Sequence, residues 1–583
     1  MRRLVVSFIL LIAPLFAASN SIPTVNQPLV PSAVAPGAGA FVLRVNGSAF
    51  VAGAIVKWNG NPLSTRFINR SELKALVPAV RAAKATTAVI TVTNPAPGGG
   101  RSNPVFFTVT PATASLTFAP SSSFMVGTAI SDVSVGDFNN DGRMDLAVLN
   151  EGAEYTCTDG TQASEYVSMF LGNGDGTFVP GETLELGCGS SFLDGSDFAM
   201  VAADFNGDGR IDLAISFTGD MCCVEPGRWV LAYLGNGDGT FNVEPYVVGN
   251  VSNGMGIPVA ADFNGDGNRD LAIEGGDFGY ILYVFEGQGD GTFPGGPETD
   301  LSPAFDGAAS SWLAAGDFNR DGLLDMVSPP VNNLPSILLG NGDGTFSAAS
   351  SQPPFAASAN APAVGDFTGD GILDLAVTDA SANLNILVGN GDGTFIPRNG
   401  EPNAGPYGTP LTSDLNGDGK LDLAVSSATG NLVYLGNGDG TFQNALAIGP
   451  NGSTVGIADF NGDGRLDLVT LNANTITVLV QAPTAVPSSV DVRFGKQAVG
   501  TSSPARRITL ANSGSAALHL SSIISNGDFA ETNDCRAIVP LGQSCHIDVV
   551  FKPTAKGFRS GTITITDNAA NSPQLIQLSG MGD

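Results

Sequence analysis

Seven acidic segments of nine residues recur along this 583-residue chain, and their side chains are the ones best suited to chemistry. Each segment has Asp at positions 1, 5 and 9 and Gly at position 6, and position 3 is Asn in all but one, where it is Thr368. Carboxylate and amide oxygens are the ligands that hard cations prefer, and glycine permits the sharp turn that gathers them round one centre. The pattern therefore predicts metal-binding loops.

Calcium is the cation that such loops suit best, because it accepts six to eight oxygens, whereas magnesium needs a stricter octahedron. We predict side-chain ligands at positions 1, 3, 5 and 9 and a backbone carbonyl at position 7, which gives about seven Ca²⁺ per chain. The predicted ligands are Asp137, Asn139, Asp141, Arg143 and Asp145; Asp204, Asn206, Asp208, Arg210 and Asp212; Asp262, Asn264, Asp266, Asn268 and Asp270; Asp317, Asn319, Asp321, Leu323 and Asp325; Asp366, Thr368, Asp370, Ile372 and Asp374; Asp414, Asn416, Asp418, Lys420 and Asp422; and Asp459, Asn461, Asp463, Arg465 and Asp467.

Two other interpretations of the segments are weaker. An EF-hand loop requires Glu at position 12, but the chain has Val148, Ile215, Ile273, Ser328, Val377, Val425 and Thr470 there. One isolated copy would be an ordinary polar turn. Seven copies place 21 carboxylates in seven clusters, where like charges repel unless a cation offsets them.

Spacing and composition indicate the elements that position these loops. The segments start 67, 58, 55, 49, 48 and 45 residues apart, and the chain holds 75 Gly and 36 Pro without an amphipathic helical period. Such a repeat of short strands is typical of β-propeller blades. We predict an all-β chain with seven blades.

A second motif alternates with the acidic segments and predicts a tight turn in six blades. It reads GNGDGTF, or GQGDGTF in one copy, and Asn-Gly between strands favours a type I′ turn with positive φ at both residues. The seventh blade has no such turn. We expect residues 115–127 to supply its outer strand and close the ring, which removes open sheet edges.

The first 19 residues predict a secretory signal peptide, since Arg2 and Arg3 precede an apolar run that is too short to span a bilayer. We expect an extracellular or cell-surface protein, or a periplasmic one, without membrane insertion. The formal net charge of −29 makes nucleic acid a poor partner. Six cysteines suit an oxidising compartment.

Residues 113–482 resemble the FG-GAP or VCBS-type repeats of integrin α-chain propellers and many exported bacterial proteins. That resemblance implies a calcium-braced propeller with an adhesion or ligand-binding role. Residues 20–112 are similar to IPT/TIG immunoglobulin-like domains. Residues 483–583 resemble ASH-type immunoglobulin-like domains, and there we expect a Cys535–Cys545 disulfide. The expected architecture is thus a seven-bladed calcium-binding propeller flanked by two immunoglobulin-like β-sandwiches.

Binding, rather than catalysis, is the expected function. The only histidines, His519 and His546, lie in the C-terminal domain, so the propeller offers no Ser-His-Asp or Cys-His site. A polysaccharide lyase or glycosidase that uses a carboxylate pair remains the alternative. The expected partner is an extracellular glycan or protein.

The ligand is expected on the face opposite the acidic loops, where the longest connections lie. Those connections contain Cys157, Cys188, Cys222 and Cys223, whose pairing the sequence leaves open. Aromatic side chains are frequent anchors in binding sites. We therefore predict a ligand rim formed by Tyr155, Tyr166, Trp229 and Trp312.

Overall fold

A computed structural model describes residues 19–583, apart from residues 114–115, 128, 151–154, 157–161, 164–165, 187–197, 220–226, 243–245, 251–255, 276–280, 301–311, 332–333, 350–360, 379–382, 402–407, 428–429, 450–451 and 570. Its elements are β-strands and one 3₁₀ turn, η1 (Ala79–Ala82). In this part of the chain no helix has the length and apolar character needed to cross a bilayer. The all-β prediction is confirmed.

Seven four-stranded antiparallel sheets form the propeller, and in the first six blades the strands follow in chain order from the centre outwards. In the first four blades these strands are β12 (Ile130–Gly136), β13 (Asp145–Asn150), β16 (Tyr166–Gly172) and β17 (Phe178–Glu185); β18 (Ala199–Ala203), β19 (Asp212–Gly219), β20 (Gly227–Tyr233) and β21 (Tyr246–Asn250); β22 (Val259–Ala261), β23 (Asp270–Gly275), β24 (Ile281–Phe285) and β25 (Glu298–Asp300); and β26 (Ala314–Gly316), β27 (Asp325–Val331), β28 (Leu334–Gly340) and β29 (Phe346–Ala348).

The fifth blade contains β30 (Ala363–Gly365), β31 (Asp374–Thr378), β32 (Leu384–Gly389) and β33 (Phe395–Glu401), and the sixth contains β34 (Leu411–Ser413), β35 (Asp422–Ser427), β36 (Gly430–Tyr434) and β37 (Leu446–Ile448). A small hairpin, β14 (Tyr155–Thr156) with β15 (Gln162–Ala163), extends the connection between β13 and β16.

The seventh blade is built from both ends of the propeller segment. Its strands β38 (Ser453–Ala458), β39 (Asp467–Asn472) and β40 (Thr475–Gln481) come from the end, and β11 (Phe118–Met125) pairs with β40 as the outer strand. This confirms the predicted closure by residues 115–127. The first and seventh blades then share a core in which Val148 packs with Phe460 and Val469.

Packing between blades follows from the second strand of each, which is buried on both faces. In β13, Leu146 and Val148 belong to the core shared with the seventh blade, whereas Ala147 and Leu149 belong to the core shared with the second. Alternate side chains of one strand thus serve two interfaces, because a strand's side chains alternate between its faces.

A ring pair repeats between neighbouring blades. The aromatic residue at position 2 of one acidic loop packs on the phenylalanine of the next blade's turn motif, as Phe138 does on Phe241 at 6.2 Å between centroids. The equivalent pairs are Phe205–Phe293, Phe263–Phe346, Phe318–Phe395, Phe367–Phe442 and Phe460–Phe178. These contacts confirm that position 2 belongs to the core.

The N-terminal segment forms a sandwich of two sheets around Trp58, Phe50 and Phe107. One sheet has the order β1 (Thr24–Val25), β3 (Phe41–Ser48), β7 (Glu72–Val77) and β6 (Ser64–Asn69). The other has β2 (Ala33–Val34), β10 (Val105–Val109), β8 (Thr86–Asn94), β4 (Ile55–Trp58) and β5 (Asn61–Pro62), with β9 (Gly100–Arg101) paired to β8.

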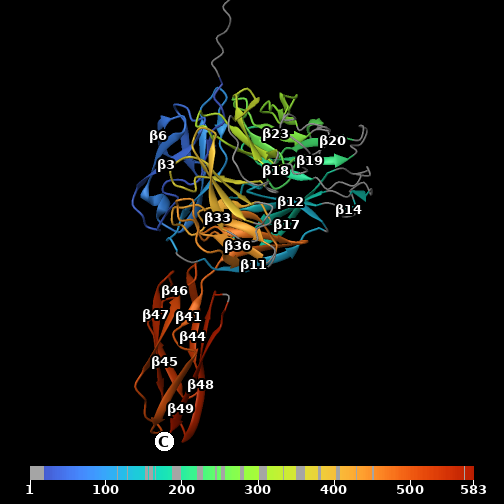
Figure 1. Cartoon of the computed structure of the whole chain (residues 1–583). Helices are drawn as coiled ribbons and strands as arrows, with labels where there is room; N and C mark the ends of the chain where they lie inside the picture. Colours follow the sequence, from blue (N-terminus) through green and yellow to red (C-terminus); the bar gives the residue numbers. More distant parts are fainter. Residues whose placement is uncertain are drawn as a thin grey trace, which may run out of the picture.

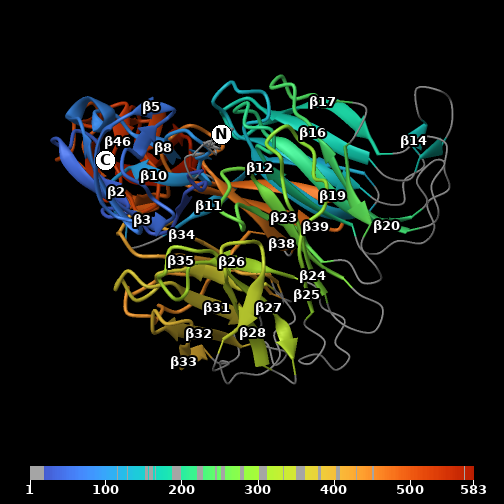
Figure 2. The same ribbon diagram turned by 90° about the horizontal axis from the view of Figure 1, so that it is seen from above.

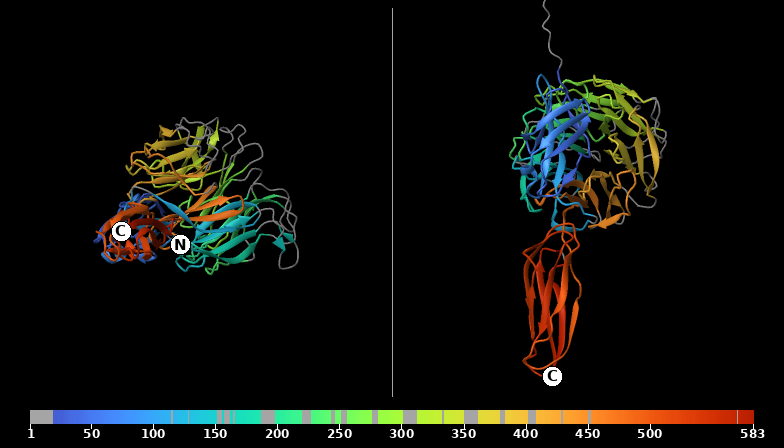
Figure 3. Two further views of the ribbon diagram at one scale, coloured as in Figure 1. Left: turned by 90° about the horizontal axis from the view of Figure 1, so that it is seen from below. Right: turned by 90° about the vertical axis from the view of Figure 1, so that its left-hand side faces the viewer.

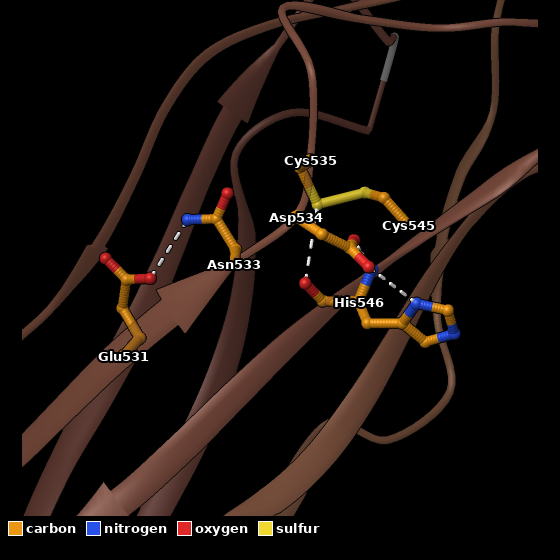
Figure 4. The surroundings of a disulfide bond; sticks show 6 residues. All are labelled: Glu531, Asn533, Asp534, Cys535, Cys545 and His546. Carbon is orange, nitrogen blue, oxygen red and sulfur yellow. Dashed lines mark hydrogen bonds and ion pairs between the residues drawn. A yellow bond between two sulfur atoms is a disulfide. The ribbon is translucent and has the colours of Figure 1, made fainter.

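The C-terminal segment forms a second sandwich, which extends away from the ring (Figure 1). Its sheets are β41 (Ala485–Pro487), β43 (Arg506–Asn512), β47 (Ser544–Phe551) and β45 (Phe529–Asn533); and β42 (Asp491–Gln497), β49 (Gln574–Gly582), β48 (Gly557–Asp567), β44 (Leu518–Ser525) and β46 (Ile538–Val539). A Cys535–Cys545 disulfide lies at one end of it, as expected (Figure 4).

The N-terminal sandwich lies against one face of the ring. It stands in front of the propeller when the left-hand side of Figure 1 faces the viewer (Figure 3, right). The hairpin β14–β15 lies on the far side of the ring from β3 and β6 in two perpendicular views (Figures 1 and 2). The two faces of the propeller are therefore not equivalent.

Candidate metal centres

Each acidic loop connects the first and second strands of its blade. Position 1 follows the first strand directly, as Asp137 follows β12, and position 9 opens the second strand, as Asp145 opens β13. Position 6 has positive φ in every loop, 86° at Gly142, so glycine is the residue that fits there without strain. Position 4 also has positive φ, and the first and fourth loops tolerate Asn140 and Arg320 in it.

The position-1 carboxylate is oriented identically in all seven loops. Its Oδ2 accepts a hydrogen bond from the position-6 N–H, at 3.0 Å from Gly142 to Asp137. The same bond joins Gly209 to Asp204, Gly267 to Asp262, Gly322 to Asp317, Gly371 to Asp366, Gly419 to Asp414 and Gly464 to Asp459. The carboxylate thus presents Oδ1 to the interior of the loop.

Side-chain oxygens of positions 1 and 3 accept hydrogen bonds from the same backbone N–H, that of position 5. In the first loop the Asp141 N–H lies 3.0 Å from both Asp137 Oδ1 and Asn139 Oδ1. The third, sixth and seventh loops repeat this arrangement. Position 5 turns back in the same way, because its Oδ1 accepts the position-7 N–H, as Asp141 does from Arg143 at 2.9 Å. The sequence-predicted oxygens of positions 1, 3 and 5 are therefore brought together.

Two of these oxygens lack a partner. Asp204 Oδ1 and Asp317 Oδ1 are buried, and neither has a hydrogen-bond partner within the described residues. In the fifth loop Thr368 takes the place of Asn, and its hydroxyl lies 3.5 Å from Asp366 Oδ1. A buried carboxylate oxygen without a donor is unfavourable, and a cation would satisfy it.

The position-9 carboxylate has a structural role that the sequence did not suggest. Asp325 Oδ2 accepts the Phe318 and Asn319 N–H groups at 2.8 and 3.2 Å, and its Oδ1 accepts the Gly340 N–H at 2.9 Å. Equivalent carboxylates are Asp145, Asp212, Asp270, Asp374, Asp422 and Asp467, all fully buried. Position 9 thus ties the acidic loop to the third strand of its own blade.

Burial and mutual repulsion oppose ionisation of these groups. Burial, followed by the charges of positions 1 and 5, raises the pKa of Asp270 and Asp325 to about 7. It raises the pKa of Asp145, Asp212 and Asp374 to about 6, as it does for Asp262 and Asp317 at position 1. The pKa values of Asp422 and Asp467 are raised as well. Each loop therefore holds acids that a positive charge would stabilise.

The turn motifs are structural, but they are not the two-residue type I′ turns that we predicted. In the first blade, Gly174 and Gly176 have positive φ and Asn173 does not. The Asn173 N–H instead bonds to Thr177 O at 2.9 Å, and Asp175 Oδ1 accepts from the Thr177 N–H and hydroxyl. The turn is longer because Oδ1 of the aspartate caps it internally.

Acidic loops and turn motifs lie on one face of the ring. The Gly176 N–H of the first blade donates to Phe460 O in the seventh blade's acidic loop, and the Gly239 N–H donates likewise to Phe138 O. Three further pairs are Gly344–Phe263, Gly393–Phe318 and Gly440–Phe367. Within the described residues, these hydrogen bonds join the turns and acidic loops of neighbouring blades at five junctions.

The predicted ligand rim requires a correction. Trp229 and Trp312 are only 8% and 3% exposed, because they fill the cores between blades 1 and 2 and between blades 4 and 5. Burying the large apolar surface of an indole ring in the core is more favourable than exposing it in a loop, so neither tryptophan is a surface anchor. Tyr166 is half-buried in β16.

The fourth predicted rim residue and the four cysteines of the long connections fall, in whole or in part, outside the described residues. Tyr155 belongs to β14, and its side chain is outside the described residues. Cys157, Cys188, Cys222 and Cys223 also lie outside the described residues.

A second group of potential ligands surrounds the C-terminal disulfide. Asp534 lies beside Cys535 and Cys545, and its carboxylate bonds to the His546 N–H at 2.6 Å and to His546 Nδ1 at 3.0 Å (Figure 4). The hydrogen bonds of His546 lower the pKa of Asp534. Since both sulfurs are committed to the disulfide, this group is a structural clamp.

Comparison with known families agrees with the repeat architecture. Residues 155–215, 219–273, 331–377 and 414–470 match the FG-GAP-like repeat, and residues 488–583 match Cep192 domain 4. The propeller thus contains four segments that match FG-GAP-like repeats. No curated protein matches the chain.

Comparison with solved structures finds matches of low similarity. A lectin from Agrocybe aegerita, described as recognising non-reducing terminal N-acetylglucosamine, is 18% identical, with 72% of this chain and all of that chain covered and a TM-score of 0.40. The ASH/PapD-like domain 7 of human CEP192 is 12% identical over 18% of this chain and 87% of its own, with a TM-score of 0.16. An auxiliary nutrient binding protein from Bacteroides ovatus is 10% identical over 79% and 98%, with a TM-score of 0.28. These values are too low to transfer a ligand.

Proposed function

We propose that this chain is an exported, calcium-braced propeller that binds an extracellular glycan or protein and converts no substrate. The observation that carries the proposal is the repeated loop, in which three acids are gathered with an oxygen left unpartnered at Asp204 and Asp317. A fold that commits 21 carboxylates to seven such loops uses them for bracing rather than for turnover.

The donor set fits calcium. Positions 1, 3 and 5 supply convergent carboxylate and amide oxygens. The position-7 carbonyl and the position-9 carboxylate would complete an all-oxygen set. When bound, the ion supplies the positive charge that offsets the clustered acids. The chain's own residues fix the loop beforehand, through the bond from the position-6 N–H to position 1 and the three bonds to position 9.

Measured stoichiometry tests the calcium proposal. Equilibrium dialysis followed by elemental analysis should find about seven Ca²⁺ per chain. Asp204→Asn should remove about one ion, because that carboxylate has the unpartnered oxygen. The matched control is Asp238→Asn, which changes the internally capped turn aspartate of the same blade and should leave the count unchanged. Absence of bound calcium, together with an unaltered melting curve in EDTA, would refute the proposal.

The ligand surface is proposed on the face that carries β14, because the N-terminal sandwich lies on the acidic-loop face. The resemblances to integrin α-chain propellers and to IPT/TIG and ASH domains favour an extracellular adhesion role with the two sandwiches as spacers. Incubation with a glycan and extracellular-matrix array, with and without calcium, is the test. A retained and chemically unchanged ligand supports binding, whereas product formation would establish the polysaccharide-acting alternative.

A further inference from the structure

Charge divides the chain sharply between its first two parts. Residues 20–112 contain eight Lys or Arg and a single acid, Glu72, whereas residues 113–482 contain 47 Asp or Glu and eight Lys or Arg. The basic part lies on the face of the propeller where the acidic loops are. Opposite potentials favour this contact, although they do not by themselves fix its geometry.

Direct contacts reach the metal-ligand candidates themselves. The Ile22 N–H donates to Asp262 Oδ2 at 2.6 Å, and the Ser32 hydroxyl donates to Asp414 Oδ2 at 2.5 Å. Both acceptors are position-1 carboxylates, and they are 7% and 6% exposed. The sandwich therefore holds the third and sixth loops through the oxygen that also accepts the position-6 N–H.

Backbone contacts extend the interface and depend on loop conformation. The Asp366 N–H donates to Gln27 O at 3.1 Å, and the N–H of Thr113, the residue that directly follows the sandwich, donates to Asn416 O at 2.9 Å. The Ser21 hydroxyl donates to Gly265 O at 3.3 Å. Gly267 packs so closely on the Gly98–Gly99 backbone that a Cβ would lie 2.6 Å from Gly99 N. Such contacts form only when the loops keep their present shape.

Coverage of the loops is uneven. The contacts above reach the third, fifth and sixth loops, and Arg465 Nη2 of the seventh donates to Pro111 O at 3.4 Å. Within the described residues, no hydrogen bond links residues 19–112 to the fourth loop, although Arg70 packs beside its Gly322, and none links them to the first or second loop. There Asp141 and Asp208 instead form exposed ion pairs with Arg143 and Arg210 of their own loops.

We propose that the N-terminal sandwich is a calcium-dependent cap, so that the chain has open sites in loops one and two and capped sites in loops three, five, six and seven. This inference rests on the proposed calcium function. The sandwich bonds to Oδ2 of Asp262 and Asp414, and Oδ1 faces the loop interior, so cap and cation do not compete. Each stabilises the loop conformation that the other needs.

Removal of calcium has two opposite effects on docking. It leaves the loops more negative, which attracts the basic sandwich, but charges farther apart than about 8 Å are screened at physiological salt. It also lets the three acids of each loop repel one another, so the conformation that presents Asn416 O and the Asp366 N–H becomes a minor state. The short-range contacts contribute more than the screened attraction, so removal of calcium weakens docking of the sandwich. By linkage, the cap raises the calcium affinity of the capped loops by the same factor.

Hydrogen exchange of the full chain tests the cap. Peptides that contain Thr113 and Asp366 report the two backbone bonds across the interface, and calcium should slow exchange of these amides by about 5- to 150-fold relative to EDTA, the usual range for coupled sites. Exchange in the C-terminal sandwich should not change. Small-angle scattering should show the chain expanding in EDTA.

Matched variants separate a capped loop from an open one. Asp418→Asn removes one charge from the sixth loop, which is capped, and keeps an acceptor for the Lys420 N–H. Asp208→Asn removes one charge from the second loop, which is open, and keeps an acceptor for the Arg210 N–H. Asp418→Asn should speed exchange at Thr113, and Asp208→Asn should not. Ser32→Ala should loosen the cap and weaken calcium binding in the capped class, with the exposed Ser64→Ala as its control.

The outcomes discriminate between the two proposals. If calcium binds but exchange at Thr113 and Asp366 is the same with and without it, the cap is overturned and the calcium function stands. If no calcium binds, both are overturned. Equal effects of Asp418→Asn and Asp208→Asn at Thr113 would also overturn the cap.

Discussion

Gln481 closes the one seam of the ring that lacks the repeated contacts. The seventh blade has no turn motif, and the sixth loop has Leu415 where the others have phenylalanine. The Gln481 N–H takes the place of the turn glycine on Asp467 Oδ1 at 2.9 Å. Its Nε2 donates to Leu415 O at 2.8 Å and to Leu466 O at 2.9 Å. One residue, through its backbone N–H and its side chain, thus makes the contacts that the turn motif makes in other blades.

Gln481→Met removes those two side-chain bonds with little change in shape. The side chain is 2% exposed, so two carbonyls lose their partners without access to water. Each unsatisfied buried group costs about 1–3 kcal/mol. The substitution also removes Gln481 Oε1, which is itself buried without a partner, and this returns about 1–3 kcal/mol. The expected net loss in the free energy of unfolding of the propeller is about 1–3 kcal/mol.

Intrinsic fluorescence can report this transition alone. Trp229 and Trp312 are buried in the propeller, and Trp58 is the one other tryptophan, in the N-terminal core. In a Trp58→Phe background, urea unfolding followed by tryptophan emission therefore reports the propeller. Gln443→Met is the matched control, because that side chain is exposed in the sixth blade's turn region.

The order of the urea midpoints of unfolding tests the role of Gln481. We expect the parent and Gln443→Met to unfold together and Gln481→Met to unfold at lower urea. Gln481→Glu should be least stable, since it places a carboxylate against two carbonyl oxygens. If Gln481→Met matched the parent, the seam would be held by β11–β40 pairing alone and our reasoning would be wrong.

Further predictions concern buried acids, the disulfide and the tryptophans. In EDTA the melting temperature should fall as pH rises from about 4 to 7. Burial raises the folded-state pKa of Asp270 and Asp325 to about 7, so the unfolded chain loses these protons at a lower pH than the folded chain does. Saturating calcium should abolish this trend. Glu274 is 1% exposed, and neither of its carboxylate oxygens has a partner in the described residues. Burial raises the pKa of this carboxyl group. Glu274→Met should therefore raise the free energy of unfolding at pH 7 by about 1–3 kcal/mol and not lower it. Joint Cys535→Ala and Cys545→Ala changes should cost about 2–3 kcal/mol in calorimetry, confined to the C-terminal transition. Trp312→Ala should destabilise the propeller by about 3–5 kcal/mol, measured by urea unfolding, as a core truncation does and a rim residue would not.

Features that repeat in the sequence were predictable from it. Seven copies of Asp at positions 1, 5 and 9 predicted seven loops, and Gly142 and its counterparts take the positive φ that position 6 requires. The missing seventh turn predicted the closure that β11 makes with β40. Repetition makes such inferences strong, since a local conformational demand appears seven times with the same residue.

Features that depend on neighbours were not predictable. Trp229 and Trp312 lie near long connections in the sequence, but packing between blades buries them. The type I′ expectation for Asn173 failed because Asp175 and Thr177 complete a longer turn. The basic composition of residues 20–112 was a signal for the cap, although it did not indicate which face or which loops the sandwich would contact.

The sequence by itself determined the repeat, the candidate ligands and the β-strand character, because these follow from residue types at fixed short spacing. Only the tertiary structure decided that position 9 ties each loop to its own third strand, that Gln481 stands in for a turn, and that Ile22 and Ser32 reach Asp262 and Asp414. Those contacts join residues 14 to 382 positions apart. Hydrogen bonds at such separations are set by how the blades and the sandwich pack, and no local pattern encodes them.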